Sequence, residues 1–242
     1  MKNQPTNTFT VNHHALLGLL IFLGTLLFFS STLTAQPDHD IDKINKKPNI
    51  EDLGKGRYRI GSIIVNKPEK SFQVPGEILR LQPPLEFLAV TKGGMKGYES
   101  LLELDVNAFE FNLACILIGL DKEKAKAPEF HFSEEPAQGD PVSIWISWEQ
   151  DGKNVRIPAS NSLLEGEKTI NNNWVYSASG FTPSGEYLAS VDGTLVGFVH
   201  DPASIIEHTK GLGLGNYGAV SGNAAVLPAV GSKILFTVER KM

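Results

Sequence analysis

The chain has 242 residues and carries 22 Lys and Arg against 27 Asp and Glu, which gives a formal net charge of −5 at pH 7. This length allows one large domain with a sizeable core, and the acidic balance without a basic stripe argues against nucleic acid as a partner. The single cysteine, Cys115, excludes an intramolecular disulfide, an iron–sulfur cluster and a Cys-rich zinc site, because each of these needs more than one thiolate.

The first 35 residues are typical of a secretory leader. After a weakly basic start, an apolar run extends from Ala15 to Phe29 with Thr25 as its only polar residue, and small and polar residues follow up to Ala35. Cleavage after Ala35 is the preferred interpretation. The alternative is an uncleaved anchor, since Ala15 to Ala35 approaches the roughly 20 residues that a spanning helix needs. Both interpretations predict export to the periplasm, the cell envelope or the medium, with membrane contact only through this segment if it is uncleaved.

Three regions are expected along the chain: a leader or anchor at 1–35, a flexible spacer at 36–54 and a single domain at 55–242. The spacer is rich in charged residues and has few side chains that can pack into a core. Its Asp38-His39-Asp40 run contains metal-ligand side chains, but nothing nearby fixes their geometry. A solvated tether is therefore predicted there, and no metal site.

The domain contains many short segments with the features of β-strands. The clearest is Val142 to Trp148, where apolar residues alternate with Ser143, Trp145 and Ser147. Asp151-Gly152 follows, which is typical of a tight hairpin turn leading into a returning strand. The predicted strands are 57–65, 71–74, 86–91, 99–105, 142–148, 155–158, 174–178, 187–190, 194–200 and 233–239.

One helix is predicted over residues 107–119. Asn107 is suited to cap it, Glu110 is three residues later, and Gly119 is a natural stop. The segment is apolar on nearly all sides after Glu110, which indicates a helix inside the domain, and Cys115 is interpreted as a small core residue. A short helix is expected after Asp201, with Pro202 at its first position. These elements predict an α+β fold, mainly an antiparallel sheet with one buried central helix.

Recognisable catalytic motifs are absent from the sequence. It contains no zinc-protease or phosphate-loop motif and no Gly-x-Ser-x-Gly. The glycine-rich run 211–218 lacks the strand-to-helix context of a nucleotide loop, and we interpret it as a surface loop. No cofactor is predicted.

Five residues are candidates for ligand binding: Tyr98, Glu99, Ser100, Trp145 and His200. The first three follow a glycine-rich loop at the start of an apolar strand, where a ligand or another backbone can approach closely. His200, followed by Asp201 at a strand end, is the best placed histidine. Trp145 lies on the polar face of its strand and either packs under a loop or offers an aromatic surface to a sugar or peptide. The alternative for each is a purely structural role.

Several motifs, taken in order, resemble the YdjY-domain family of exported bacterial proteins. They are Gly97-Tyr98-Glu99-Ser100-Leu101-Leu102, the helix end at 116–120, Gly139 to Trp148, Trp174 to Ser179, and Gly193 through Ala203. The similarity extends over roughly Arg57 to Val238. It implies export and no established activity. The ferredoxin-like label that some relatives carry does not apply as chemistry here, because Cys115 is alone.

Two classes of function follow from these observations. The first is a non-catalytic envelope module that binds a small molecule or an envelope protein near Tyr98–Ser100 or on a sheet face. The second is an envelope hydrolase in which Glu99 and His200 act as acid and base, which requires the two side chains to meet in one pocket. A purely structural envelope component is a third possibility.

Overall fold

The computed structural model describes residues 48–214 and 216–241. The predicted leader at 1–35 and the predicted spacer up to residue 47 lie outside the described residues. The end of that spacer differs from the expectation, because Ile50–Gly54 forms strand β1 and pairs with β2, Arg57–Ile60. Within the described ranges, no helix is long and apolar enough to cross a membrane.

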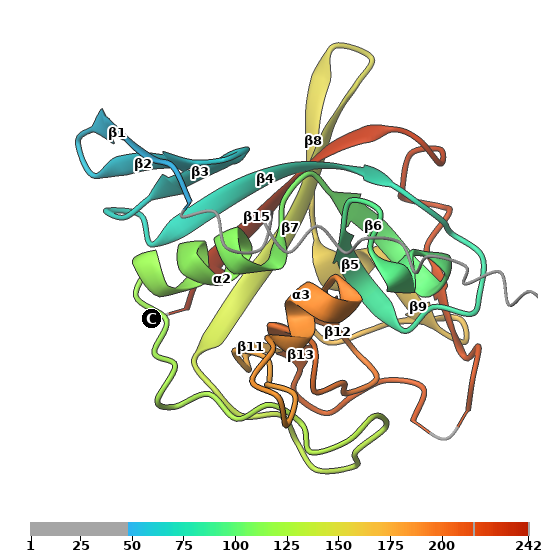
Figure 1. Cartoon of the computed structure of the whole chain (residues 1–242). Coiled ribbons are helices and arrows are strands. Elements are labelled where there is room, and N and C mark those ends of the chain that lie inside the picture. The colour runs from blue at the N-terminus through green and yellow to red at the C-terminus, as the bar shows by residue number, and fades with distance from the viewer. Residues whose placement is uncertain (1–47, 215, 242) are drawn as a thin grey trace, which may run out of the picture. The chain divides into compact units, whose positions relative to one another are not determined.

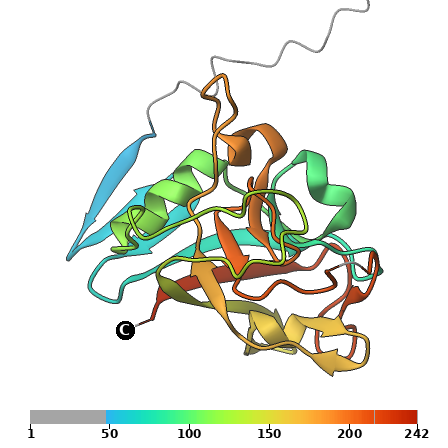
Figure 2. The same cartoon turned by 90° about the horizontal axis from the view of Figure 1, so that it is seen from below.

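The structure is mostly β, and its centre is a closed barrel of eight strands (Figures 1 and 2). Each strand pairs with the next around the barrel, and the last pairs back with the first. In this order the strands are β4 (Ser71–Ile78), β15 (Lys233–Arg240), β7 (Pro141–Gln150), β11 (Trp174–Tyr176), β13 (Ile206–His208), β12 (Thr194–Gly197), β5 (Phe87–Thr91) and β6 (Ser100–Leu104). Closure leaves these strands without a free edge along the barrel seam.

Smaller elements extend or cover the barrel. The strands β1, β2 and β3 (Ile63–Asn66) continue the sheet from β4, and β8 (Lys153–Pro158) continues it from β7. A separate small sheet contains β9 (Leu163–Glu165), β10 (Lys168–Thr169) and β14 (Val220–Gly222). The helices are α2 (Ala108–Leu117) and α3 (Leu188–Asp192), with 3₁₀ turns η2 (Met95–Glu99) and η3 (Ala159–Ser162). Helices α2 and α3 lie beside the barrel strands in Figure 1.

Alternation along the long strands separates the core from the outer surface. On β4, β7 and β15 the inward side chains are large and buried: Phe72, Val74, Ile144, Ile146, Phe236 and Val238. The residues between them, including Gln73, Trp145 and Thr237, point to the outer face. Successive strand residues point to opposite faces of the sheet. One set of side chains therefore fills the barrel, and the other set forms its outer surface.

The predicted fold class is wrong. The structure is 40% strand and 12% helix and forms a closed barrel, so it is not a mainly antiparallel sheet around a central helix. Two neighbouring pairs in the barrel, β5–β6 and β12–β13, are parallel. The closure depends on the pairing of β6 with β4, which are separated in the sequence by β5 and η2. Local alternation of apolar residues contains no information about such a long-range pairing.

The predicted central helix is also corrected. Asn107 caps α2 as expected, since its Oδ1 accepts a hydrogen bond from the Glu110 backbone N–H at 2.8 Å. However, α2 packs with one side only: Phe111 and Cys115 are buried, whereas Phe109 is 52% exposed and Ile116 is 42% exposed. Phe111 packs against the inward-pointing Phe72 and Phe236, with ring centres 5.1 Å and 6.5 Å apart, so α2 covers the barrel core with one side and is exposed on the other.

Two further local predictions fail and one is confirmed. No helix follows Asp201, because its Oδ1 accepts the Ala203 N–H and closes a turn instead. Residues 187–190, predicted as a strand, belong largely to helix α3, which ends at Gly193 with φ of 77°. The β7–β8 hairpin is confirmed, with Asp151 and Gly152 both at positive φ between the paired strands.

At Gly76, the strand that pairs with β4 changes from β3 to β6. Residues 71–73 of β4 pair with β3, and residues 76–78 pair with β6. A Cβ at Gly76 would lie 2.5 Å from the Glu103 carbonyl oxygen and 2.6 Å from Leu104 Cδ2. The bare Cα therefore allows β6 to approach β4 and close the barrel.

We expect Gly76→Ala to lower the free energy of unfolding by about 1–3 kcal/mol, because the added methyl group forces the β4–β6 seam apart. Urea denaturation of the full chain measures this change. Gly97→Ala is the matched control, since a Cβ there makes only an ordinary contact with Leu79 at 3.4 Å. Equal effects of the two substitutions would contradict the role assigned to Gly76.

Candidate functional site

Four of the five predicted site residues lie on adjoining segments, and the fifth does not. Tyr98, Glu99 and Ser100 are at the end of η2 and the start of β6, beside the segment before β5, where the Glu86 N–H donates to the Glu99 carbonyl oxygen. His200 follows β12, the other neighbour of β5 in the sheet. Trp145 is on β7, which is separated from β5 by three strands in both directions around the barrel.

The three consecutive predicted residues have different environments. Lys96 Nζ donates to Glu99 Oε1 at 3.0 Å, and Ser100 Oγ donates to the Lys96 carbonyl oxygen at 2.7 Å. Glu99 and Ser100 are buried, whereas Tyr98 is 59% exposed. The Tyr98 side chain is therefore accessible to a ligand. The buried Glu99 carboxylate is paired with Lys96.

A second ion pair lies next to the first. His131 Nε2 is 3.1 Å from Oε2 of the buried Glu86. The close contact with the Glu86 carboxylate raises the pKa of His131 above its ordinary value, burial opposes this, and the negative charge of Asp201 raises the pKa further. Burial alone would lower the pKa of Lys96, but its hydrogen bond to Glu99 and the charges of Glu99 and Asp201 outweigh burial and raise it.

Further carboxylates surround these two cations. Asp201 is buried and its charge acts on both Lys96 and His131. Burial raises the pKa of Asp192 at the end of α3, and the charge of Asp201 raises it further, although Lys96 opposes both. We call this group the charged cluster: Glu86, Lys96, Glu99, His131, Asp192 and Asp201. Carboxylates outnumber cations in it, so its net charge is negative.

Exposed aromatic side chains accompany the charged cluster. Tyr98 precedes Glu99, and the exposed Phe130 precedes His131. Tyr217, which is 64% exposed, lines a narrow cleft together with Glu86 and Phe132. We call Tyr98, Phe130 and Tyr217 the aromatic rim. Each of the three thus adjoins a residue of the charged cluster, and exposed aromatic residues are enriched on recognition surfaces.

His200 is a structural residue in this arrangement. Its ring is fully buried, with Nδ1 2.6 Å from the Ser133 carbonyl oxygen and Nε2 2.8 Å from the His208 carbonyl oxygen. Both ring nitrogens thus have backbone partners, and the Glu99 oxygen Oε1 accepts from Lys96. This geometry gives the hydrolase alternative no support.

A buried carboxyl group, Glu207, lies beneath the charged cluster. Its Oε1 accepts the Asp201 backbone N–H at 2.8 Å, and no described residue pairs with its Oε2. Complete burial raises the pKa of Glu207 to about 8, although the hydrogen bond from Asp201 lowers it. A Cβ at Gly197 would lie 2.7 Å from Glu207 Oε1, so the glycine makes room for this group.

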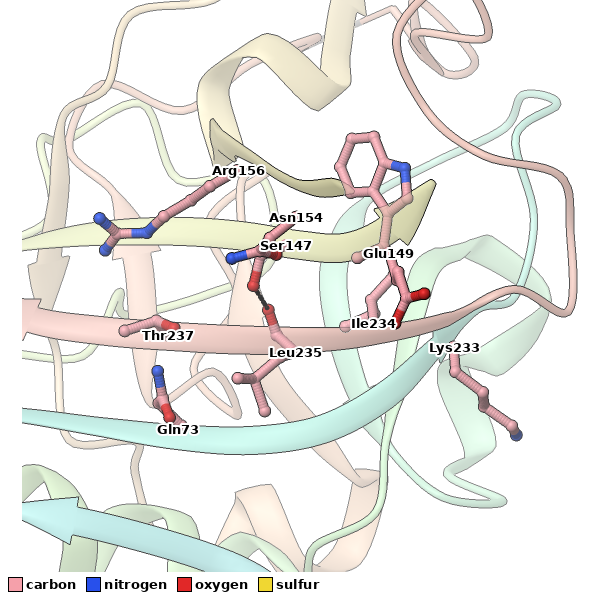
Figure 3. A pocket seen from close by; sticks show the side chains of 10 residues that line it. Gln73, Ser147, Glu149, Asn154, Arg156, Lys233, Ile234, Leu235 and Thr237 are labelled. Carbon is pink, nitrogen blue, oxygen red and sulfur yellow. Dashed lines mark hydrogen bonds between the residues drawn. The ribbon is translucent and has the colours of Figure 1, made fainter. Parts of the chain in front are cut away.

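Trp145 belongs to a separate surface on the outer wall of the barrel. Its Nε1 donates to Glu239 Oε2 at 2.9 Å, and the Arg156 guanidinium lies 4.2 Å from its ring centre. Arg156 also borders a groove of about 410 Å³ over β4, β15, β7 and β8 (Figure 3). Trp145 thus packs against Arg156, which forms a wall of the groove.

The charged cluster contains residues that the sequence analysis missed. Glu86, His131 and Asp192 are far apart in the chain and are brought together by the barrel and its loops. Only Lys96 and Asp201 lie within two residues of a predicted site residue, so only these two could have been found from their position in the sequence. Among residues 48–214 and 216–241, no group of three or more His, Cys, Asp or Glu side chains is arranged to hold a metal ion.

The family of the chain follows from a family model. The model of the YdjY domain matches residues 63–239, which is most of the chain and includes both the charged cluster and the outer-wall groove. Comparison with curated proteins and with solved structures gave no match. The chain therefore belongs to the YdjY-domain family.

Proposed function

We propose that this protein is an exported, non-catalytic binding module and that its charged cluster, with the aromatic rim, holds a cationic group of the ligand or partner. The observation that carries the proposal is the excess of carboxylates over cations in a largely buried group bordered by exposed aromatic side chains. Export is supported by the apolar N-terminal segment. The ligand in this proposal bears an ammonium or guanidinium group.

The electrostatics of Asp192 favour an incoming cation. Its pKa is raised by burial and by Asp201, which means that its negative charge is poorly compensated in the free protein. Asp192 is half-buried and so keeps a path to solvent. A positive group placed beside Asp192 and Asp201 would supply the missing compensation.

The aromatic rim supplies the second part of the interaction. A cation near the face of a Tyr or Phe ring is attracted by about 0.5–1 kcal/mol at an exposed site. Tyr98 already lies with its ring centre 6.0 Å from Lys96 Nζ, so this ring accepts a cation in the free protein. A lysine- or arginine-bearing peptide segment combines the required charge with an apolar stem that packs on aromatic side chains.

The test is isothermal titration of the full chain with hexalysine, with hexaglutamate as the opposite-charge control. We expect saturable binding of hexalysine that weakens with salt, and no binding of hexaglutamate. Asp192→Asn and Tyr98→Ala should each weaken binding about 3- to 10-fold, which corresponds to roughly 0.6–1.4 kcal/mol.

Glu149→Gln and Phe109→Ala are the matched controls, since they remove an exposed carboxylate and an exposed ring from other surfaces. Both should leave the affinity unchanged. The proposal fails if hexalysine does not bind, or if Asp192→Asn and Glu149→Gln have the same effect.

A further inference from the structure

The outer-wall groove is a second cavity, distinct from the charged cluster. Its volume of about 410 Å³ is within the range of ligand sites in proteins. Figure 3 shows side chains from four neighbouring strands around it: Gln73 of β4, Thr237 of β15, Ser147 of β7 and Asn154 of β8. The groove is thus built on the sheet itself, which holds its lining residues more rigidly than loops would.

The register of the strands explains why the sheet is hollow here. Thr237 lies opposite Gln73 on one side and Trp145 on the other, and Ser147 lies opposite Arg156. The two hydroxyl residues are short, and they are only 4% (Thr237) and 8% (Ser147) exposed between longer neighbours. They form the floor, while Gln73, Asn154 and Arg156 form the walls.

Apart from Arg156, Lys233 and Glu149, the polar side chains that line the groove are neutral hydrogen-bonding groups. Hydroxyl groups of Ser147 and Thr237 both donate and accept, and the amides of Gln73 and Asn154 do the same. Ser147 Oγ has only a long hydrogen bond of 3.3 Å to the Leu235 carbonyl oxygen. Thr237 is directly opposite Gln73, whereas Ser147 and Asn154 are each offset by two residues from the direct partner, so these groups follow a diagonal line across the sheet.

The cations beside the groove are already paired. Arg156 Nη2 is 2.6 Å from Glu239 Oε1, and Lys233 forms an ion pair with Glu77. An anionic ligand would have to compete with these carboxylates, whereas a neutral ligand leaves the pairs intact. The guanidinium has five N–H donors, so the pair with Glu239 leaves donors of Arg156 for hydroxyl oxygens of a ligand.

Arg156 is also held in place before any ligand binds. It lies over the Trp145 ring at 4.2 Å, and Glu239 joins the two side chains by accepting from both. A wall that is already ordered costs less conformational entropy on binding.

We infer that the outer-wall groove binds a neutral glycan, with the hydroxyl and amide groups of Thr237, Ser147, Gln73 and Asn154 contacting sugar hydroxyls and Arg156 donating at one wall. Such a ligand matches the groove in three respects: it is rich in donors and acceptors, it is uncharged, and it is extended along a shallow surface. The inference is independent of the charged cluster.

The experiment is titration calorimetry of the full chain with cellotetraose, an unsubstituted hexose chain, and with the tetramer of N-acetylglucosamine. Saturable binding of at least one is expected. Thr237→Val keeps the volume of the floor residue but removes its hydroxyl, and it should weaken binding at least fivefold. Asn154→Ala changes an exposed wall residue and should also weaken binding, which keeps the test valid if the floor variant is unstable.

Thr169→Val on the exposed strand β10 is the matched control and should not change the affinity. Tyr98→Ala should not change it either, which separates this site from the cationic-ligand proposal. The inference is overturned if neither sugar binds at millimolar concentration, if Thr237→Val and Asn154→Ala bind as the parent does, or if tetragalacturonate, an anionic chain, binds more tightly than both neutral sugars.

Discussion

Replacing Glu207 by glutamine is expected to remove a large pH dependence from the stability of the protein. The folded state holds this carboxyl group with a pKa of about 8 because it is completely buried, against 4.5 in an exposed environment. Between these two values the folded state binds a proton that the unfolded state has released. The stabilising contribution of the neutral carboxyl group is therefore complete below pH 4.5 and is lost as the pH rises through 8.

Urea denaturation of the parent chain and of Glu207→Gln at pH 5, 6, 7, 8 and 9 measures this effect. In the middle of the window, the stability of the parent relative to the variant should fall by about 1.4 kcal/mol per pH unit. The glutamine side chain keeps an oxygen that accepts the Asp201 N–H, so the fold is preserved. Other groups that titrate here, including Asp192 and His131, are present in both proteins and cancel in the difference. Parallel pH profiles of the two proteins would contradict the prediction.

His200→Ala should be among the most destabilising single substitutions outside the apolar core. The ring bridges the carbonyl oxygens of Ser133 and His208, which are 67 and 8 residues away in the chain. Its removal leaves the Ser133 carbonyl oxygen without this contact and creates a cavity in a fully buried position, whereas the His208 carbonyl oxygen keeps the Gly211 N–H as a donor. An unsatisfied buried group costs about 1–3 kcal/mol and the cavity adds to this, so we expect a loss of about 3 kcal/mol or more.

The control for this prediction is Phe109→Ala, since Phe109 is 52% exposed on α2 and its side chain has no polar atom. It should cost less than His200→Ala in the same denaturation experiment. A change below about 0.5 kcal/mol for His200→Ala, the range of ordinary surface substitutions, would show that the two hydrogen bonds do not hold the Ser133 segment to the barrel.

The two proposed sites are built from different kinds of structural element. The charged cluster uses loops and short helical segments gathered around β5 and β12, whereas the outer-wall groove uses the faces of the four strands β4, β15, β7 and β8. They lie on separate parts of the barrel wall, so a ligand at one does not occlude the other. In the two proposals, one molecule would bind a cationic partner and a glycan together.

The amino-acid sequence by itself determined the local features of this protein. The β7–β8 hairpin follows from alternating residues and Asp151-Gly152, and the start of α2 follows from the hydrogen bond between Asn107 and Glu110. Cys115 is buried as its apolar neighbours indicated. The sequence also indicated Tyr98 and Glu99 as candidate site residues, because polar residues at the start of an apolar strand are unusual.

Only the tertiary structure decided the architecture and the sites. Barrel closure rests on the pairing of β4 with β6, and that choice among many possible strand partners depends on packing of the whole core. The same closure left α2 as a one-sided cover of the barrel core. It also joined Glu86, His131 and Asp192 to Lys96 and Glu99, because side chains distant in sequence meet only when the strands that carry them take their places around the barrel.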